Sequence, residues 1–556
     1  MFFFTFTKKN MNKNYLLIFL LYSLFGYSQN TLGTLTNTAN SLDGYILFSP
    51  RTSDVNKNTY LINNCGEVIN QWPSTFNLFS TDYLMPDGTL YRSVIDNQST
   101  LNIPGNTGRI EHLNWDGSTI WALTYSDTDY SFHHDYVVLD NGNIIMLAAK
   151  RRTEQEAIDN GRDPSTMVQG ELYEEYLIEI EPVGTNGFNV VWEWYSWDHL
   201  IQDFDNTKLN FGVVADHPEL MDINFGTNFG EADWWHSNAI SYSPELDHII
   251  ISNRNQNEFI IVDHSTTTAE AATSSGGNSG MGGDIIYRYG NPQSYDQGVE
   301  ADQKLFAQHD VQFIPPGSPN AGKVMMFNNG LGLNFTRIQI IDLPYDSMTQ
   351  NYTYSGGAYG PNTVDWEYSD PVDPFNFYAA FLSGAQELPN GNILICHGPD
   401  GLLFEVDATD SSTVWSYQSP VSVTGILTDG TDPSTETTRV FRALKYPSDY
   451  AGLIGQDLTP GAVIELSPNE DNCELLSISE VLNNDSIKVY PTIVENDLFI
   501  QTSLVDYEIR LYSISGQLMN TYKPTEKLDL QFLEAGLYFV EILEGNTTKT
   551  IKIIKN

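Results

Sequence analysis

The stretch FAQHDVQFIPPG (Phe306–Gly317) has four relatives elsewhere in the chain. Each relative is a short alternating run that ends in turn residues such as Pro, Asn, Asp or Gly. The relatives are FSTDYLMPDG (Phe79–Gly88), FHHDYVVLDNG (Phe132–Gly142), WHSNAISYSP (Trp235–Pro244) and FLSGAQELPNG (Phe381–Gly391). Alternation followed by turn residues predicts a β-strand. The chain therefore contains an internal repeat built on strands.

Three copies of this repeat carry a histidine near the start of the predicted strand. Counting back six residues from the turn places Ser80, His134, His309 and Ser383 at equivalent positions, whereas His236 fits only with slippage of about two residues. His133 and His134 are adjacent, so only one of them faces the same side as the other histidines. The repeat register favours His134.

A second repeat element, offset from the first, appears six times and consists of an apolar strand, a turn and a strand that usually bears Trp or Tyr. Its copies are Thr59–Trp72, Gly108–Tyr125, Tyr176–Tyr195, Phe259–Gly290, Ile338–Tyr368 and Leu402–Tyr417. Four short strands per unit, at a period of roughly 60–75 residues, are typical of a β-propeller blade. We therefore expect an all-β chain with a six-bladed β-propeller over residues 44–468.

The first predicted blade begins at GYILFSP (Gly44–Pro50) and lacks its innermost strand. VFRALKYPSDY (Val440–Tyr450) has the pattern of that strand, so we expect the far end of the domain to complete the first blade. Two long inserts are predicted between strands. Lys150–Glu174 is charged and suits a helix or a lid, and Asp198–Asp233 is acidic, aromatic and leads directly to His236.

The two ends of the chain differ from the repeat region. Residues 1–28 have the basic start, apolar run and small residue of a signal peptide, and residues 29–43 form a polar lead-in. From Ser477 the charge becomes nearly balanced and β-branched alternation dominates, which predicts a small β-sandwich over 477–556. With three cysteines no disulfide framework is possible, but Cys65 and Cys473 are expected to form one bond.

The composition limits the partners. A net charge of −44 argues against nucleic acid and anionic membranes, and no later segment resembles a membrane span. An anionic substrate would need a local positive pocket within this field.

In a propeller the first strands line the central channel, so His134, His236 and His309 are expected to meet near its mouth, beside Arg254. Asn238, two residues after His236, is expected to face the same side.

Two families resemble parts of this sequence. Ile487–Asn556, with its AGLYFVEI strand and basic terminal strand, resembles the C-terminal sorting domain of the type IX secretion system of Bacteroidetes. That resemblance implies export to the medium or the cell surface, with the secretion machinery as a partner. Residues from about Gly44 to Pro468 resemble the bacterial arylsulfotransferases. The matching motifs are HHD with LDNGN, WHSN followed by SNRNQNE, QHD followed by FNNG, and SGAQELPNGN.

The second resemblance implies transfer of a sulfuryl group from an aryl sulfate to a phenol through a sulfohistidine, with no nucleotide sulfate, cofactor or metal. By motif the nucleophile falls on His309, and His236, Arg254 and His134 support it. Substrate-binding roles fall on Asn238, Ser383 and His133. Neutral imidazole can attack and leave, while a guanidinium stabilises the charge of the moving SO₃ unit.

Two alternatives from other classes remain open at this stage. Three convergent histidines could bind zinc with an open position and hydrolyse an ester, although Arg254 would be poorly placed beside a dication. The propeller could instead be a secreted binding or adhesion module. Trp234 and Trp235, next to His236, are candidates for stacking on an aryl ring.

Overall fold

A computed structural model describes residues 31–51, 55–96, 98–226 and 231–468 and, towards the C-terminus, 487–490, 493–494, 496–502, 507–513, 518–533, 536–544 and 547–555. The predicted signal peptide and Cys473 lie outside these residues. The chain divides into two compact units: unit 1 comprises residues 1–36 and 40–470, and unit 2 comprises residues 37–39 and 471–556. No helix within the described residues is long and apolar enough to cross a membrane.

The described part of unit 1 is all-β, with few and short helices, and contains six antiparallel sheets of four or five strands. We number the sheets along the chain. Sheet 1 is β33(Val440–Pro447)-β2(Gly44–Pro50)-β3(Asn58–Asn63)-β4(Val68–Pro73), and sheet 2 is β5(Asn77–Leu84)-β6(Leu90–Ile95)-β7(Gly108–Leu113)-β8(Thr119–Thr124). Sheet 3 is β9(Tyr130–Val138)-β10(Ile144–Thr153)-β11(Glu171–Val183)-β12(Gly187–Tyr195).

The remaining three sheets follow the same order. Sheet 4 is β15(Ser237–Ser243)-β16(His248–Asn253)-β17(Glu258–Asp263)-β18(Tyr287–Tyr289), and sheet 5 is β19(His309–Phe313)-β20(Val324–Asn328)-β21(Arg337–Ile341)-β26(Trp366–Tyr368). Sheet 6 is β27(Gly384–Glu387)-β28(Ile393–His397)-β29(Leu402–Val406)-β30(Thr413–Gln418)-β1(Gly33–Asn37). The strand β1 comes from the predicted polar lead-in, which the sequence pattern had not marked as a strand.

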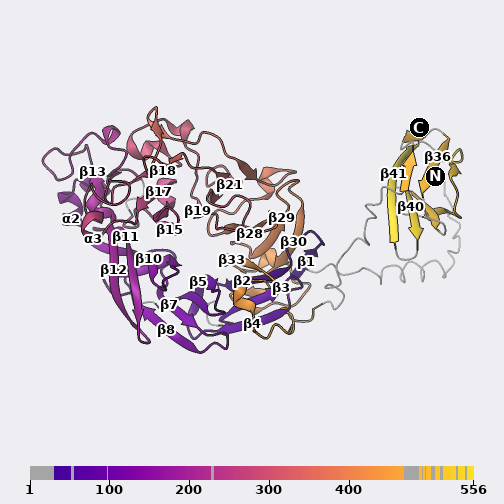
Figure 1. The fold of residues 1–556 in the computed structure, drawn as a ribbon, viewed down its shortest axis with the longest axis horizontal. Coiled ribbons are helices and arrows are strands. Elements are labelled where there is room, and N and C mark those ends of the chain that lie inside the picture. Colours follow the sequence, from indigo (N-terminus) through magenta and orange to yellow (C-terminus); the bar gives the residue numbers. More distant parts are fainter. Residues whose placement is uncertain are drawn as a thin grey trace, which may run out of the picture. The chain divides into compact units, whose positions relative to one another are not determined.

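The first strands of consecutive sheets contact one another. β5 contacts β9, β9 contacts β15, β15 contacts β19, β19 contacts β27, β27 contacts β33, and β33 contacts β5. In Figure 1 the labels of β15, β19 and β33 lie towards the middle of unit 1, and those of β4, β8 and β12 lie at its periphery. The strands that carry the histidine repeat are thus brought together although they are far apart in sequence.

Apolar side chains fill the space between neighbouring sheets. Ile145, Leu147 and Trp194 of sheet 3 pack with Ile249 and Ile260 of sheet 4, and similar clusters join the other neighbouring pairs, including sheet 6 with sheet 1. Each sheet is covered on both faces, which explains why its central strands are continuous apolar runs such as HIIISN and VMMFN. The second repeat supplies this packing through Trp192, Trp194 and Tyr368.

The predicted pairing of the two ends of unit 1 is confirmed. β33 pairs antiparallel with β2, with Gly44 opposite Pro447 and Phe48 opposite Ala443. Only the two ends of the first insert extend β10 and β11, and between them lie turns and the short helix α2 (Glu154–Asp159), capped by Thr153 and Glu156. The second insert contains only short elements, and its end approaches the cavity described below.

Unit 2 contains two sheets in its described residues. One is β34(Ile487–Tyr490)-β36(Asp497–Thr502)-β39(Lys527–Asp529), and the other is β35(Ile493–Val494)-β41(Thr547–Lys555)-β40(Gly536–Glu544)-β37(Glu508–Ser513)-β38(Leu518–Tyr522). Leu498 and Ile500 of the first sheet share one apolar core with Ile509, Val540 and Ile553 of the second.

Cys65 of unit 1 is disulfide-bonded, whereas Cys396 is a buried free thiol.

Candidate active site

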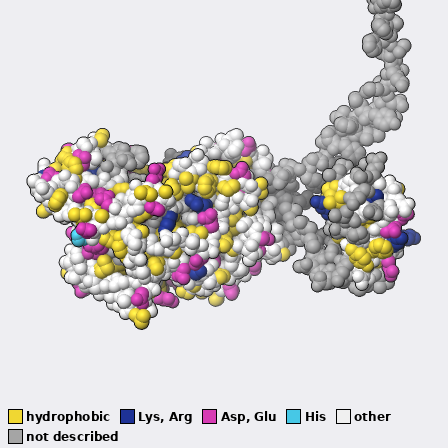
Figure 2. Space-filling view, turned by 90° about the horizontal axis from the view of Figure 1, so that it is seen from above, with side chains coloured by type: hydrophobic (Ala, Val, Ile, Leu, Met, Phe, Trp, Pro, Cys, Tyr) yellow, Lys and Arg dark blue, Asp and Glu magenta, His cyan; other side chains and the backbone are white. Residues whose placement is uncertain are grey.

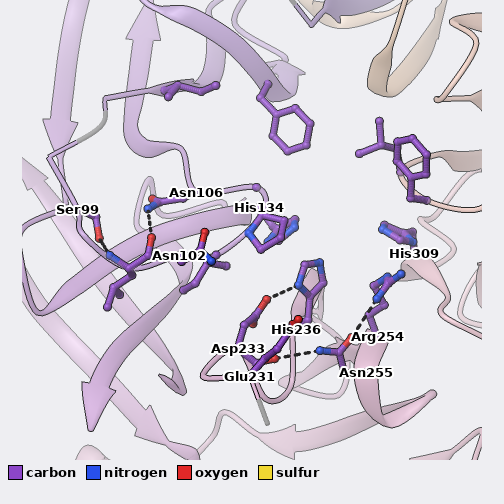
Figure 3. Close-up of a pocket in the computed structure, with 18 of the residues that line it drawn as sticks. Ser99, Asn102, Asn106, His134, Glu231, Asp233, His236, Arg254, Asn255 and His309 are labelled. Atoms are coloured by element: carbon purple, nitrogen blue, oxygen red, sulfur yellow. Dashed lines mark hydrogen bonds and ion pairs between the residues drawn. The ribbon is translucent and has the colours of Figure 1, made fainter. Parts of the chain in front are cut away.

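A cavity of about 610 Å³ in unit 1 is lined by side chains from several sheets. Its polar residues include His134, His236, His309, Arg254 and Asp233. Figure 3 shows the three imidazoles directed at one open space, with Arg254 between His309 and Asn255. The structure therefore brings together the three histidines and the arginine that the sequence predicted to meet.

Irregularities in the first strands direct these histidines into the cavity. The pairing register shifts opposite His134, after Ser237 and after His309, so each of the three strands carries a β-bulge at this level. His134 and His236 themselves have φ of 54° and 51°. Positive φ is uncommon for residues with a side chain, and bulges often re-aim side chains beside active sites.

His309 is held in one tautomer by its neighbours. Its Nδ1 lies 3.1 Å from the Ala307 carbonyl oxygen and 2.8 Å from Asn329 Oδ1. The Asn329 amide donates to the carbonyls of Ala379 and Leu382, at 2.7 and 3.1 Å, which orients its Oδ1 towards the imidazole. Because both partners of Nδ1 accept, Nδ1 carries the hydrogen and Nε2 has the free lone pair.

The charge state of His309 follows from its surroundings. Its side chain is 3% exposed. Burial and the positive charge of Arg254 lower the pKa of His309 to about 3, although the bond to Asn329 acts in the opposite direction. The ring is therefore neutral near pH 7, which is the state that a nitrogen nucleophile needs.

His236 forms a dyad with a carboxylate. Asp233 Oδ2 lies 2.6 Å from His236 Nδ1 and accepts its hydrogen. This contact orients the ring and would stabilise an imidazolium formed by protonation at Nε2, as in other His–Asp pairs. The dyad lies next to His134, since the His134 and His236 ring centroids are 5.1 Å apart.

His134 stands at the end of a buried hydrogen-bonded chain. His133 Nε2 donates to Glu175 Oε2 at 2.8 Å, and the Nδ1 atoms of His133 and His134 are 2.9 Å apart. Burial, together with nearby His236, holds the pKa of His134 well below its usual value, so its ring is neutral. Because His133 Nε2 donates to Glu175, His133 Nδ1 accepts from His134 Nδ1, and His134 Nε2 carries the free lone pair.

Arg254 supplies the cavity with positive charge. Its Nη1 donates to Asn255 Oδ1 at 3.0 Å, and no described carboxylate forms an ion pair with it. Burial lowers the pKa of Arg254, but not enough to remove its charge, since Asp233 and Glu231 act against the shift. A guanidinium in this state is suited to bind an anion.

A buried ion-pair cluster joins the same repeat strands. Arg442 of β33 lies 3.2 Å from an oxygen of Asp135 in β9 and 2.9 Å from an oxygen of Asp310 in β19. Burial raises the pKa of Asp310 to about 6. Burial opposes the charge of Arg442, but the two carboxylates outweigh it and raise the pKa of that group. The two aspartates belong to the HHD and QHD motifs, and the sequence did not predict that these motifs also form a buried ion-pair cluster.

Three predicted substrate-binding residues are not among the described residues that line the cavity. His133 is fully buried between His134 and Glu175, so His134 is the member of that pair that faces the cavity. Asn238 donates to the Gln308 carbonyl at 2.7 Å, because the bulge after Ser237 breaks the alternation on which the prediction relied. Ser383, with φ of 84°, accepts a hydrogen bond from the Gly398 amide at 2.9 Å.

The aromatic side of the cavity also differs from expectation. Trp234 and Trp235 belong to the apolar cluster between sheets 3 and 4. Phe79 and Phe381 line the cavity instead, and both open copies of the first repeat. Arg51 and the loop from Ser99 to Asn106 complete the wall. The His134 amide donates to the Gly105 carbonyl, and a Cβ on Gly105 would overlap the His134 ring, so this loop needs glycine there.

Comparison with known proteins finds two matching families. Residues 32–424 match the family described as "Arylsulfotransferase (ASST)", and residues 488–556 match the "Secretion system C-terminal sorting domain". A search of the curated proteins finds no match. The sorting domain indicates export and secretion by the type IX system of Bacteroidetes-type bacteria, as the sequence predicted.

The solved structures that the comparison finds are distant from this chain. A Bacteroides caccae protein of unknown function is 9% identical, with 72% of this chain and 98% of that chain covered and a TM-score of 0.38. The periplasmic gluconolactonase of Pseudomonas aeruginosa is 11% identical, with 68% and 96% covered and a TM-score of 0.33. The family assignment rests on the sequence match, which spans most of unit 1 and includes all three cavity histidines: the chain belongs to the arylsulfotransferase family.

Proposed function

We propose that residues 44–468 form a six-bladed β-propeller that transfers sulfuryl groups between aryl compounds. The first strands of the six sheets contact one another in order, and the first strand of the last sheet contacts that of the first sheet. These contacts support six blades around a channel. The apolar clusters between neighbouring sheets support the same arrangement. The domain follows a signal peptide (1–28) and a lead-in (29–43). A sorting domain over 477–556, built as a small β-sandwich, follows it.

The observation that carries the proposal is the tautomer of His309. With Nδ1 donating to Ala307 and Asn329, the lone pair of Nε2 attacks the sulfur of an aryl sulfate. The N–S bond forms, the S–O bond to the aryl group breaks, and the phenolate oxygen takes a proton from an imidazolium. The sulfated ring keeps its Nδ1–H, whose two oxygen acceptors stabilise the positive charge.

The second half of the cycle reverses the first. The oxygen of an acceptor phenol attacks the sulfur, the N–S bond breaks, and the phenol proton passes to an imidazole. His309 is regenerated neutral, and the imidazolium used in the first half is restored. Both halves place charge on the three sulfuryl oxygens, and Arg254, which has no described carboxylate partner, stabilises it.

Two histidines take part in the transfer of the proton to and from the phenol oxygen. His236 is the acid in the first half and the base in the second, because Asp233 stabilises its imidazolium. His134 supports it through the chain to His133 and Glu175. Asn238, His133 and Ser383 act as positioning residues: each fixes the backbone or ring of a segment that lines the cavity.

The test uses the purified protein, p-nitrophenyl sulfate and phenol. We expect phenol-dependent release of nitrophenolate that survives a chelator and disappears in His309→Ala. Without acceptor, the peptide that contains His309 should gain the mass of one SO₃ group in the wild type. Loss of activity with the chelator would replace this proposal with the zinc hydrolase. A chain that neither turns over nor becomes sulfated with any phenol tried would favour a binding module.

A further inference from the structure

Arg51 and Arg254, which line the cavity, lack the carboxylate partners that other arginines of unit 1 have. Arg92 pairs with Glu111, Arg288 with Glu258, and Arg442 with two aspartates. Arg162 forms no described ion pair but donates to the Ile223 carbonyl. In the described part of the chain, Arg51, Arg254 and Arg439 have no ion pair.

This lack of partners is unusual for the composition of the chain. There are 71 acidic residues against 27 basic ones. Figure 2 shows acidic side chains spread over one face of unit 1 and fewer basic ones. Carboxylates thus outnumber cations, and cations left without them are candidates for holding an anionic ligand.

Arg51 lines the phenylalanine side of the cavity, and Arg439 lies beside Arg51 but is not among the described residues that line the cavity. The Arg51 amide donates to the Arg439 carbonyl at 2.7 Å. The Arg51 guanidinium lies 4.8 Å from the ring centroid of Phe79, and that of Arg439 lies 5.1 Å from the ring centroid of Phe381. Burial and the positive charge of Arg439 lower the pKa of Arg51. Two like charges are held close together, which an anion between them would stabilise.

The other charges of the cavity lie nearer to Arg254. Asp233 is bound to His236, and Glu231 is exposed. Both carboxylates act on the pKa of Arg254, whereas among the described residues Arg439 is the charge that acts on the pKa of Arg51. Arg254 is the cation beside His309 and serves the transferred sulfuryl group. Arg51 is a second cation at the same cavity that the transfer itself does not use.

The dimensions of the cavity leave room for a substituted ring. A volume of about 610 Å³ falls within the roughly 300–1,000 Å³ that suits drug-sized ligands. Phe79 and Phe381 offer apolar faces for an aryl group, and each of them has a guanidinium over its ring. A ring bound here would present its substituents to Arg51.

We propose that Arg51, flanked by Arg439, binds an anionic substituent on the aryl substrate, so that the enzyme prefers phenols that carry a carboxylate over neutral phenols of the same shape. This inference rests on the proposed function, because it assigns a substrate class to the same cavity. It does not depend on which residue accepts the proton.

The experiment compares two acceptors that differ only in charge. With p-nitrophenyl sulfate as the donor at low salt, kcat/KM is measured for 4-hydroxyphenylacetate and for 4-hydroxyphenylacetamide. We expect the carboxylate to be preferred about 10-fold or more, through KM, because a charge-assisted hydrogen bond is stronger than a neutral one. In Arg51→Gln, and in the double variant with Arg439→Gln, the ratio should fall to about one.

Arg109→Gln provides the matched control. The Arg109 guanidinium also stacks on a phenylalanine, 4.8 Å from the Phe76 centroid, but it pairs with Glu111 and is not among the described cavity residues. This variant should keep the wild-type ratio. A wild-type ratio of one or less, or a ratio that Arg51→Gln leaves unchanged, would overturn the inference.

Direct binding separates this inference from the proposed function. If neither acceptor is sulfated, the proposed reaction fails, and calorimetry still measures binding of both compounds to the full chain. Tighter binding of the carboxylate that is lost in Arg51→Gln, with an unchanged circular dichroism spectrum, would support the anion site on its own. Equal affinities for the two compounds would refute it.

Discussion

Asn329 Oδ1 lies 2.8 Å from His309 Nδ1, and the amide of the same asparagine is anchored to two backbone carbonyls. Because its orientation is fixed, Asn329 determines which imidazole nitrogen carries the hydrogen. An asparagine holds the neutral tautomer without adding a negative charge, whereas an aspartate would favour the imidazolium. The residue therefore controls both the direction and the charge of the proposed nucleophile.

Asn329 substitutions should separate these two effects. Asn329→Ala removes one acceptor, and we expect kcat to fall about 10-fold, in line with the loss of one hydrogen bond. Asn329→Asp should raise the pKa of His309 from about 3, so the acid limb of the kcat/KM profile should move to higher pH. A pH profile that does not differ between Asn329→Asp and the wild type would contradict this assignment.

Glu175→Gln tests the buried chain that ends at His134. The amide cannot accept a proton from His133, so we expect kcat to fall while KM changes little, with a shift in the pH dependence of kcat. Glu179→Gln is the control, since Glu179 is also on β11 and also contacts a histidine, His264, but does not line the cavity. A purely structural role of Glu175 would leave the pH profile unchanged.

The Asp135–Arg442–Asp310 cluster should behave as a buried ion-pair network. Arg442→Met leaves two buried carboxylates without a cation, and we expect a loss of about 3–5 kcal/mol in the free energy of unfolding. A triple variant that also carries Asp135→Asn and Asp310→Asn should recover most of that loss. Urea denaturation followed by tryptophan fluorescence gives both values, and a triple variant as unstable as Arg442→Met would contradict the network.

The raised pKa of His264 predicts that the free energy of unfolding depends on pH in the alkaline range. Burial disfavours its charge, but Asp247 and Glu179 raise the pKa of His264 to about 9. The pKa of histidine in the unfolded chain is lower, about 6.5. The charged His264 therefore contributes fully to the free energy of unfolding below about pH 6.5, and this contribution is lost as the pH rises through 9. The urea midpoint of His264→Gln should therefore lie below that of the wild type at pH 6, and this difference should shrink by pH 10. A constant difference would refute the assignment.

Much of this arrangement could be predicted because it repeats. The recurring strand patterns predicted which segments lie together, and the pairing of Val440–Pro447 with Gly44–Pro50 follows from a missing strand at one end and a spare strand at the other. His134, His236 and His309 could be grouped for the same reason, since equivalent positions of a repeat meet in space. The family motifs then pointed to the same histidines and to Arg254.

The structure differs from the sequence-based expectations where the local backbone departs from regular geometry. Asn238 was assigned to the cavity by strict alternation, and the bulge after Ser237 turns it to the Gln308 carbonyl instead. Ser383 lies in a segment with positive φ, which no pattern of residue types reveals. Arg51 could not be found at all, because it lies outside the first repeat and contacts the backbone of Arg439, which is far away in the sequence.

The pairing of β33 with β2 also has a consequence for the order of events during synthesis. The strand that completes sheet 1 is the last strand of the six sheets of unit 1 to be made, and it carries Arg442, which is 307 positions from Asp135. Until then, a nascent chain holds the two aspartates without the cation that pairs with them in the folded structure. Bringing such distant segments together is slow, because most of the chain has to be ordered first. The ion-pair cluster of unit 1 therefore forms only after the strand β33 has been synthesised.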